Sequence, residues 1–315
     1  MSPGIAAIVL SAAAIHVTWN LLLKTASEPL RFATVANTIG AMVMLPVAIV
    51  LAVVMDIDPP PAKAYALASF AGLLEVGYFS FLTAAYRRGD VSVVYPIARG
   101  TAPLLSVTLG IVLLGERLGP GGYLGVALLL SGVLAIRRPW QFFRRAARVA
   151  NPHLTAAVGF AFATGLMIAS YSAVDRTGAR ETEPWMYEGL LSVAVAIGLW
   201  LRLGVGALVR RESNPAPPLP SSADEAAIAA PARDPLLTAA FVGVASYVGY
   251  GLILFAYNQA PLTAVAPMRE SAVVFASGWG TLRLGEGGSR TEAVWRIGGA
   301  LLVVSGIFLL GADGR

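Results

Sequence analysis

Residues 77–100 read GYFSFLTAAYRRGDVSVVYPIARG, and residues 249–271 read GYGLILFAYNQAPLTAVAPMRES. The two stretches resemble each other, and further matches follow them in the same order along the chain. The matched landmarks are Ala85-Tyr86 with Ala256-Tyr257, Pro96 with Pro267, Leu114-Gly115-Glu116 with Leu284-Gly285-Glu286, and Ser131-Gly132 with Ser305-Gly306. Matches that keep one order indicate an internal repeat, and the repeat decides how the chain is built.

The composition is that of a membrane protein. Of the 315 residues, 57% are hydrophobic and 13% are charged, and the mean hydropathy is +0.70. A soluble domain carries about 25% charged residues, so much of this chain's surface must face lipid. Ten apolar runs are long enough to cross a bilayer, and they span 4–24, 32–54, 64–86, 91–114, 120–136, 154–174, 185–206, 236–257, 262–284 and 295–312. The sequence therefore predicts an all-α integral membrane protein with ten transmembrane helices.

The repeat divides these helices into two halves of five. The first half covers 1–136, a basic connecting segment covers 137–153, and the second half covers 154–315. Because five is odd, the second half starts on the opposite side of the membrane, so the predicted repeats are inverted. Secondary transporters use this architecture and bind substrate near the midplane between the repeats. The segment 137–153 is either a helix lying in the membrane interface or a charged loop, and the Pro-rich stretch 207–234 is a predicted disordered linker.

Ionisable side chains inside transmembrane helices are costly and therefore indicate function. The candidates of this kind are His16, Glu75, Arg99, Glu188, Arg269 and Glu270. The repeat aligns Arg99 with Arg269 after a slip of one residue, so we expect both beside a central cavity. An arginine fork binds a carboxylate, phosphate or phosphonate in a bidentate way. These residues predict a substrate site for an anionic or zwitterionic small molecule.

Internal ion pairs are a second interpretation of the same residues. In that case Glu75 pairs with Arg99, and Glu188 or Glu270 pairs with Arg269. The two interpretations overlap, because substrate can release a paired arginine. Burial would also suit Glu75 or Glu188 to carry a coupling proton.

Polar and aromatic residues on the predicted helices form a second layer of the candidate site. The candidates are Trp19, Asn20, Asn37, Tyr78, Tyr95, Tyr171 and Tyr250. His16 and Asn20 share a helix face because they are four residues apart. Tyrosines also mark the headgroup belt at helix ends, and a single His is more often an interhelical hydrogen bonder than a ligand.

Glycines indicate where helices approach closely. Gly121 and Gly125 have GxxxG spacing, and the last predicted helix carries Gly298, Gly299 and Gly306. These glycines form either a homodimer face or contacts within one chain.

Several function classes are disfavoured by what the sequence lacks. The chain has no cysteine and two histidines, which excludes disulfides and thiolate metal sites and leaves too few histidines for a histidine-rich metal site. We find no Walker motif, HExxH or GxSxG, and we expect no cofactor and no enzymatic activity. The net charge of +5 is modest and needs no nucleic-acid partner, because membrane proteins collect Arg in loops. An exporter of organic cations, a channel and a non-transporting membrane subunit stay as alternatives.

Six stretches resemble the drug/metabolite transporter superfamily, EamA-domain type. They are HVTWNLLLK (16–24), AYRRGDVSVVYPIARGTAPLLSV (85–107), LLGERLGPGGYLGVALLLSGVLAI (113–136), YSAVDRTGAR (171–180), LRLGEGG (282–288) and GGALLVVSGIFLLG (298–311). The resemblance implies ten helices in two repeats, transport of a small metabolite or drug-like cation without ATP, and a place in the inner (plasma) membrane. It also implies that Glu116 serves the fold, by capping or pairing at a helix end.

The orientation in the membrane is predicted in two opposite ways. Most Lys and Arg residues lie in the odd-numbered loops, and by the positive-inside rule this places both termini outside. The family resemblance implies that both termini lie in the cytoplasm. In either case the two termini share one side.

Overall fold

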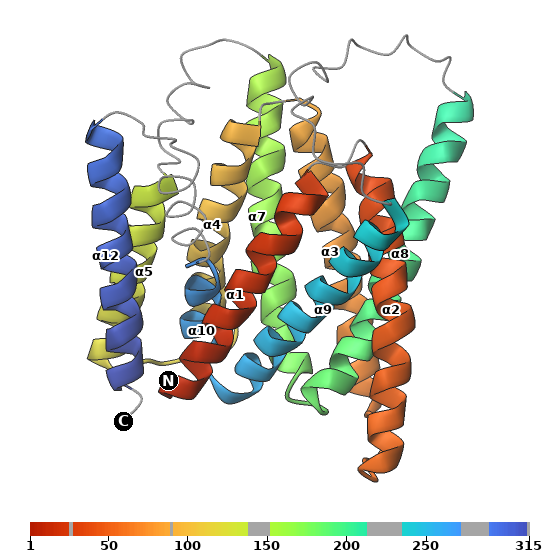
Figure 1. Cartoon of the computed structure of the whole chain (residues 1–315), viewed down its shortest axis with the longest axis horizontal. Helices are drawn as coiled ribbons and strands as arrows, with labels where there is room; N and C mark the ends of the chain where they lie inside the picture. The colour runs from red at the N-terminus through yellow and green to blue at the C-terminus, as the bar shows by residue number, and fades with distance from the viewer. Residues whose placement is uncertain (25–27, 89–90, 138–151, 213–234, 272–289, 314–315) are drawn as a thin grey trace.

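A computed structural model describes residues 1–24, 28–88, 91–137, 152–212, 235–271 and 290–313. Within these ranges the regular structure is helical, and Figure 1 shows the helices packed in one bundle. The helices are α1 (Pro3–Lys24), α2 (Pro29–Val54), α3 (Ala62–Tyr86), α4 (Val91–Val112), α5 (Pro120–Arg137), α7 (Pro152–Gly178), α8 (Pro184–Glu212), α9 (Pro235–Gln259), α10 (Leu262–Arg269) and α12 (Arg290–Asp313).

The predicted spans correspond to these helices, and one of them is described only in part. The span 262–284 appears as α10 alone, because residues 272–289 lie outside the described ranges. Five of the described helices hold a stretch long and apolar enough to cross a membrane, namely Leu30–Val54, Ala62–Tyr86, His153–Gly178, Pro184–Gly206 and Leu236–Gln259. The described part of the chain is therefore all-helical and has the make-up of a membrane protein.

Proline sets where most helices begin. It is the first residue of α1, α2, α5, α7, α8 and α9, where its missing N–H leaves no helical hydrogen bond unmade. Pro61 and Pro261 directly precede α3 and α10. The Asp-Pro-Pro-Pro stretch at 58–61 separates α2 from α3, and the Gly-Pro-Gly-Gly stretch at 119–122 contains the start of α5. Between α4 and α5 the chain turns at Gly115, whose φ of +63° favours glycine.

One predicted boundary is wrong. The linker was predicted to start at residue 207, but α8 continues to Glu212. The reason is that no helix breaker follows Gly206 until Pro215, so the helix propagates through the intervening residues. Residues 213–234 and most of the basic connecting segment, 138–151, lie outside the described ranges.

Helices from the two predicted halves interleave. In the core of the bundle α1 packs on α9, α3 packs on α7 and α8, and α2 packs on α8 and α9. α4 contacts both α7 and α10. α5 and α12 pack on each other at one edge, which Figure 1 shows on its left side.

Backbone meets backbone where α5 and α12 cross. A Cβ atom added at Gly125 would lie 2.9 Å from the Gly306 carbonyl oxygen, and one added at Gly132 would lie 2.5 Å from that of Gly299. Three of the glycines singled out in the sequence therefore serve contacts within one chain, in the way that small residues pack membrane helices. Within 4 Å of a Cβ added at Gly298 there is no other described atom.

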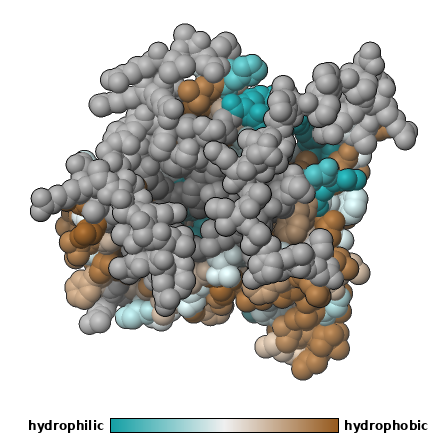
Figure 2. All heavy atoms as spheres, turned by 45° about the horizontal axis from the view of Figure 1, so that its top comes forward, coloured by the Kyte–Doolittle hydropathy of each residue, from teal (hydrophilic) through white to brown (hydrophobic). Residues whose placement is uncertain are grey.

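The outer surface of the described helices is apolar. Large hydrophobic side chains such as Val53, Leu201 and Phe308 are more than half exposed. Figure 2 shows hydrophobic residues over much of the described surface that faces the viewer. A soluble protein would not expose apolar surface on this scale, and lipid is its natural solvent.

Both chain ends lie at the same end of the bundle, as predicted (Figure 1). The α-ammonium group of Met1 donates a hydrogen bond of 3.0 Å to the carbonyl oxygen of Leu310. We call this end of the bundle, where α7 ends and α8 begins, the terminal face.

Candidate functional site

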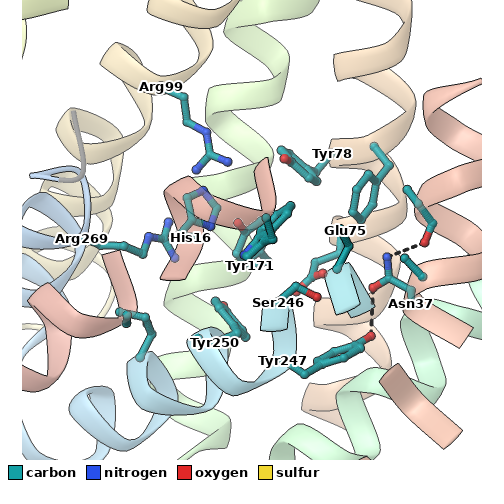
Figure 3. Close-up of a pocket in the computed structure, with 18 residues that line it drawn as sticks. His16, Asn37, Glu75, Tyr78, Arg99, Tyr171, Ser246, Tyr247, Tyr250 and Arg269 are labelled. Atoms are coloured by element: carbon teal, nitrogen blue, oxygen red, sulfur yellow. Dashed lines mark hydrogen bonds between the residues drawn. The ribbon is translucent and has the colours of Figure 1, made fainter. Parts of the chain in front are cut away.

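A cavity of about 90 Å³ lies among the helices and is lined by residues of α1, α2, α3, α4, α7, α9 and α10 (Figure 3). Its lining combines charged, polar and aromatic side chains, which is the composition of a small-molecule site. The polar and aromatic lining residues are His16, Trp19, Asn37, Glu75, Tyr78, Phe79, Arg99, Tyr171, Ser246, Tyr247, Tyr250 and Arg269.

Two guanidinium groups reach the cavity from α4 and α10. The side chains of Arg99 and Arg269 are 6% and 7% exposed, so each is withdrawn from bulk solvent. Figure 3 shows both pointing into the cavity, with Arg269 close to His16. The sequence analysis expected both arginines beside a central cavity, and both line this one.

The ion pair of Arg99 differs from the predicted one. Its Nη1 lies 3.5 Å from Oε1 of Glu270, and not beside Glu75. The reason is that α10 packs against α4, which brings the end of α10 to Arg99. The Nε atom of Arg269 is buried and has no hydrogen-bond partner among the described residues.

Glu75 lines the opposite side of the cavity from the arginines (Figure 3). It extends from α3 and lies near Ser246 of α9 in that view. Among the described residues, no ion pair joins Glu75 to an arginine. The cavity therefore has a cationic side and an acidic side.

Aromatic rings fill the space between these two sides. Tyr171 packs edge-on against Tyr78, at a centroid distance of 6.2 Å, and against Tyr250, at 6.3 Å. On α1, the rings of His16 and Trp19 are 4.7 Å apart and nearly perpendicular. Rings of this kind offer π faces and edges to a bound molecule.

Asn37 is held in place by two hydrogen bonds. Its Nδ2 donates to the carbonyl oxygen of Ala33 at 2.8 Å, and its Oδ1 accepts from the Tyr247 hydroxyl at 2.9 Å. These bonds join α2 to α9 beside the cavity. Asn37 is therefore a fixed part of the wall rather than a loose polar group.

The remaining candidates from the sequence fall into two groups. Glu188 and Glu270 are 5% and 4% exposed and are not among the residues that line the cavity. Glu188 packs against Gly251 of α9. Its Oε1 has no hydrogen-bond partner among the described residues. Asn20 lies on α1 and Tyr95 on α4, but their side chains are outside the described residues.

The sequence analysis missed Asp175. This residue of α7 is fully buried, and its carboxylate accepts hydrogen bonds from the hydroxyls of Tyr187, at 2.9 Å, and Tyr250. The sixth predicted span ended at residue 174, which left Asp175 outside the membrane core. The helix in fact continues to Gly178, and an acid within a helix of this length was the signal that could have revealed it.

Glu116 joins the two predicted halves at the terminal face. Its carboxylate accepts hydrogen bonds from the backbone N–H groups of Leu262, at 2.7 Å, and Thr263, at 2.9 Å. It also lies 3.4 Å from Nε of Arg176. A carboxylate at a helix N-terminus satisfies free N–H groups and complements the helix dipole. Glu116 was expected to cap or pair at the end of its own helix; it instead caps the start of α10 and pairs with Arg176.

A second ion pair lies at the same face. Lys63 of α3 and Glu181, after α7, are 2.8 Å apart. In addition, Asn258 Nδ2 donates to the carbonyl oxygen of Ala179 at 2.8 Å. Polar contacts therefore tie the loops together below the cavity.

Comparison with known proteins adds a family model and curated relatives. The model of the EamA-like transporter family matches residues 3–138. "Spermidine export protein MdtI" of Salmonella paratyphi B (strain ATCC BAA-1250 / SPB7) is 39% identical over 75 residues, which are 24% of this chain and 67% of that protein. The protein of the same name from Salmonella newport (strain SL254) matches to the same extent.

A solved structure covers the whole chain. It is described as "Crystal structure of protein", it is 19% identical in sequence, and the match has a TM-score of 0.64. The match covers 100% of this chain and 99% of that one. At this identity the likeness concerns the fold alone.

Proposed function

This chain belongs to the EamA-like transporter family, within the drug/metabolite transporter superfamily, and from that premise we propose that it is a secondary active transporter of a small anionic or zwitterionic metabolite. The family and its named relatives point to a small-molecule transporter of the membrane rather than to an enzyme. The observation that carries the finer proposal is the pair of buried arginines, Arg99 and Arg269, that line one cavity.

Alternating access between two inverted repeats is the proposed mechanism, with repeats at 1–136 and 154–315 joined by 137–153. The two predicted halves can be compared by replacing each helix with its counterpart in the other half. The counterparts are α1 and α7, α2 and α8, α3 and α9, and α4 and α10, and the replacement turns one observed helix–helix contact into another. The α1–α9 contact becomes α7–α3, and α2–α9 becomes α8–α3. This exchange is what a twofold axis through the bundle produces, and it supports two units that rock about a central site.

The glycine contacts of α5 and α12 support the same axis. The matched landmarks pair Gly132 with Gly306, and seven residues earlier Gly125 stands opposite Gly299 in the alignment. Exchanging the halves therefore converts the Gly125–Gly306 contact into the Gly299–Gly132 contact, and both occur.

In the proposed complex the substrate lies between the two sides of the cavity. Its carboxylate, phosphate or phosphonate binds Arg269, whose Nε is without a hydrogen-bond partner among described residues. Arg99 contributes once Glu270 shares or releases it. An ammonium group on a zwitterionic substrate would lie toward Glu75 and the tyrosine rings. Amino acids, organic phosphates and phosphonates have this chemistry.

Export of an organic cation is a second candidate, favoured by a separate observation. Acidic side chains outnumber arginines in and around the cavity, since Glu75, Asp175, Glu188 and Glu270 stand against Arg99 and Arg269 among the described residues. A polycation would balance that excess. The name of the Salmonella relatives, a spermidine export protein, agrees with this candidate.

A binding and counterflow experiment separates the candidates. Purified protein is heated with L-serine, 2-aminoethylphosphonate or spermidine, because a bound ligand stabilises the folded state by mass action. Proteoliposomes preloaded with the stabilising compound then test counterflow, which a channel does not give. Stabilisation by spermidine alone would overturn the anionic or zwitterionic class and favour the cation exporter.

Arg269→Gln is the variant that tests the site itself. We expect affinity for the anionic group to fall about 10- to 100-fold, as follows from losing a charged hydrogen bond of about 1.5–3 kcal/mol. Arg180→Gln is the matched control, because Arg180 is exposed in the turn after α7. Equal binding by both variants would contradict the role of Arg269.

We further propose that the protein resides in the inner membrane. A periplasm-active reporter fused to the C-terminus decides between the two predicted orientations. Activity of this reporter places the termini outside, as the loop charges favour. If this reporter is silent and a cytoplasm-active reporter fused at the same position is active, the result supports the arrangement that the family implies. A homodimer, the alternative that the sequence analysis left open, is tested by the mass of the protein in lipid nanodiscs.

A further inference from the structure

Asp175 stands apart from the residues that line the cavity. It is fully buried on α7 and is in contact with hydroxyl groups from two other helices, Tyr187 on α8 and Tyr250 on α9. Both are neutral donors. No ion pair of Asp175 with a basic residue occurs in the described part of the chain.

The neighbours of Asp175 are acidic or neutral apart from one arginine. The ionisable side chains that act on it from the helices packed around it are Glu75, Tyr187, Glu188, Tyr250, Tyr257 and Arg269. Arg176 follows it in the chain but is paired with Glu116. Arg99 is already paired with Glu270. Among the described residues, Arg269 alone therefore faces the three acids Glu75, Asp175 and Glu188.

An ionised carboxylate is expensive in a membrane protein interior unless a cation or a proton compensates it. No group of His, Asp or Glu in the described ranges has the arrangement of a metal site. A proton needs no such arrangement, since a single carboxylate oxygen holds it. The surplus of acids is therefore best balanced by protons when the cavity holds no cationic group.

The position of Asp175 suits exchange with the cavity. The ring of Tyr250 lines the cavity, and its hydroxyl donates to Asp175. On the other side, Tyr187 lies within the first turn of α8, at the terminal face. The three residues form a hydrogen-bonded row that runs from the cavity toward the terminal face.

We propose that Asp175 is the proton-binding residue that couples transport to a proton gradient, with Tyr250 as its connection to the cavity and Tyr187 as its connection toward the terminal face. The inference rests on the proposed transport function and adds a site that is separate from the substrate-binding residues. Loading of a proton on Asp175 and movement of the substrate would then alternate in one cycle. The proton enters and leaves as such, so no other reactant is needed.

Infrared difference spectroscopy tests the proton site without any substrate. The protein is embedded in nanodiscs and titrated with acid and base, and the carboxylic-acid carbonyl bands are followed. Wild type should show a titrating band that is lost in Asp175→Asn and kept in Glu183→Gln, an exposed acid in the turn before α8. A spectrum of Asp175→Asn that matches wild type over the whole pH range would overturn the proposal.

Proteoliposomes with an internal pH dye test the coupling. Spermidine, L-serine and 2-aminoethylphosphonate are added in turn, and the dye response is recorded beside solute exchange. For the solute that wild type exchanges, we expect a dye response that Asp175→Asn loses and that Tyr250→Phe weakens. Retained stabilisation of Asp175→Asn by the same solute in a thermal-shift assay shows that the variant is folded.

The outcomes separate the two proposals. Exchange by wild type with no dye response overturns the proton site and leaves the transporter intact. A titrating Asp175 band in a protein that exchanges none of the three solutes supports the proton site and counts against the proposed substrate class. An undiminished dye response in folded Asp175→Asn overturns the coupling role directly.

Discussion

At the contact between α5 and α12, backbone meets backbone, whereas around the cavity large polar side chains hold the helices apart. A Cβ atom added at Gly125 or Gly132 would lie less than 3 Å from a backbone carbonyl oxygen of the facing helix. Around the cavity, Arg99 and Glu270 are paired deep inside the protein. The first region shows that this bundle can pack its helices without buried charge, so the charges of the second region are retained for another purpose than cohesion.

The largest expected effect comes from breaking the ion pair beside the cavity. Arg99→Gln leaves the Glu270 carboxylate buried without its partner, and removal of one member of a buried pair costs about 3–5 kcal/mol. Thermal unfolding in detergent measures the loss. The double variant Arg99→Gln/Glu270→Gln should recover most of it, and a double variant as unstable as the single one would contradict the pairing.

The next effect is expected at the glycine contact. Gly132→Ala would place a Cβ 2.5 Å from the Gly299 carbonyl oxygen, and overpacking of this kind costs about 1–3 kcal/mol. Gly298→Ala is the matched control on α12, where the added Cβ meets no described atom within 4 Å. It should be neutral or stabilise the helix by up to about 1 kcal/mol. Unfolding transitions of equal midpoint in the two variants would contradict the contact.

Loss of the Glu116 carboxylate, at the terminal face, should have a smaller effect. Glu116→Gln keeps an acceptor for the amides of α10 but removes the charge that also faces Arg176, which we expect to cost about 1–2 kcal/mol. Glu183→Gln serves as the control, since Glu183 is exposed. Denaturation followed by tryptophan fluorescence measures both. A loss shared by the control would argue against a specific cap.

The smallest effect is expected from one hydrogen bond in the cavity wall. Tyr247→Phe keeps the ring against α2 but removes the bond to Asn37, at a cost of about 1 kcal/mol. Tyr123→Phe on the exposed side of α5 is the comparison, and its stability should not change. If both variants unfold together with wild type, the bond contributes nothing and Asn37 is held by α2 alone.

Hydropathy predicted the helices well because it depends on each helix separately. Bilayer thickness fixes the length of the apolar runs, and the prolines mark their beginnings. The same reasoning failed at the end of α7, where polar residues follow residue 174 but the helix continues to Gly178. Asp175 was lost for that reason.

The predicted repeat led to the cavity because it aligns positions that are far apart in sequence. It brought Arg99 and Arg269 to one place, and the polar residues of the same helices came with them. It did not predict that Glu270 would be the partner of Arg99, because pairing depends on which helices touch. Hydropathy and spacing contain no information on contacts between helices.

The bond between Glu116 and the start of α10 has a consequence for how the protein is made. Glu116 emerges from the ribosome well before Leu262 and Thr263, whose amides it caps. During synthesis the first five helices are therefore inserted before the amides that this carboxylate caps have been made. A gene cut between the two halves should give stable protein only when both fragments are produced in the same cell, and neither fragment should accumulate alone.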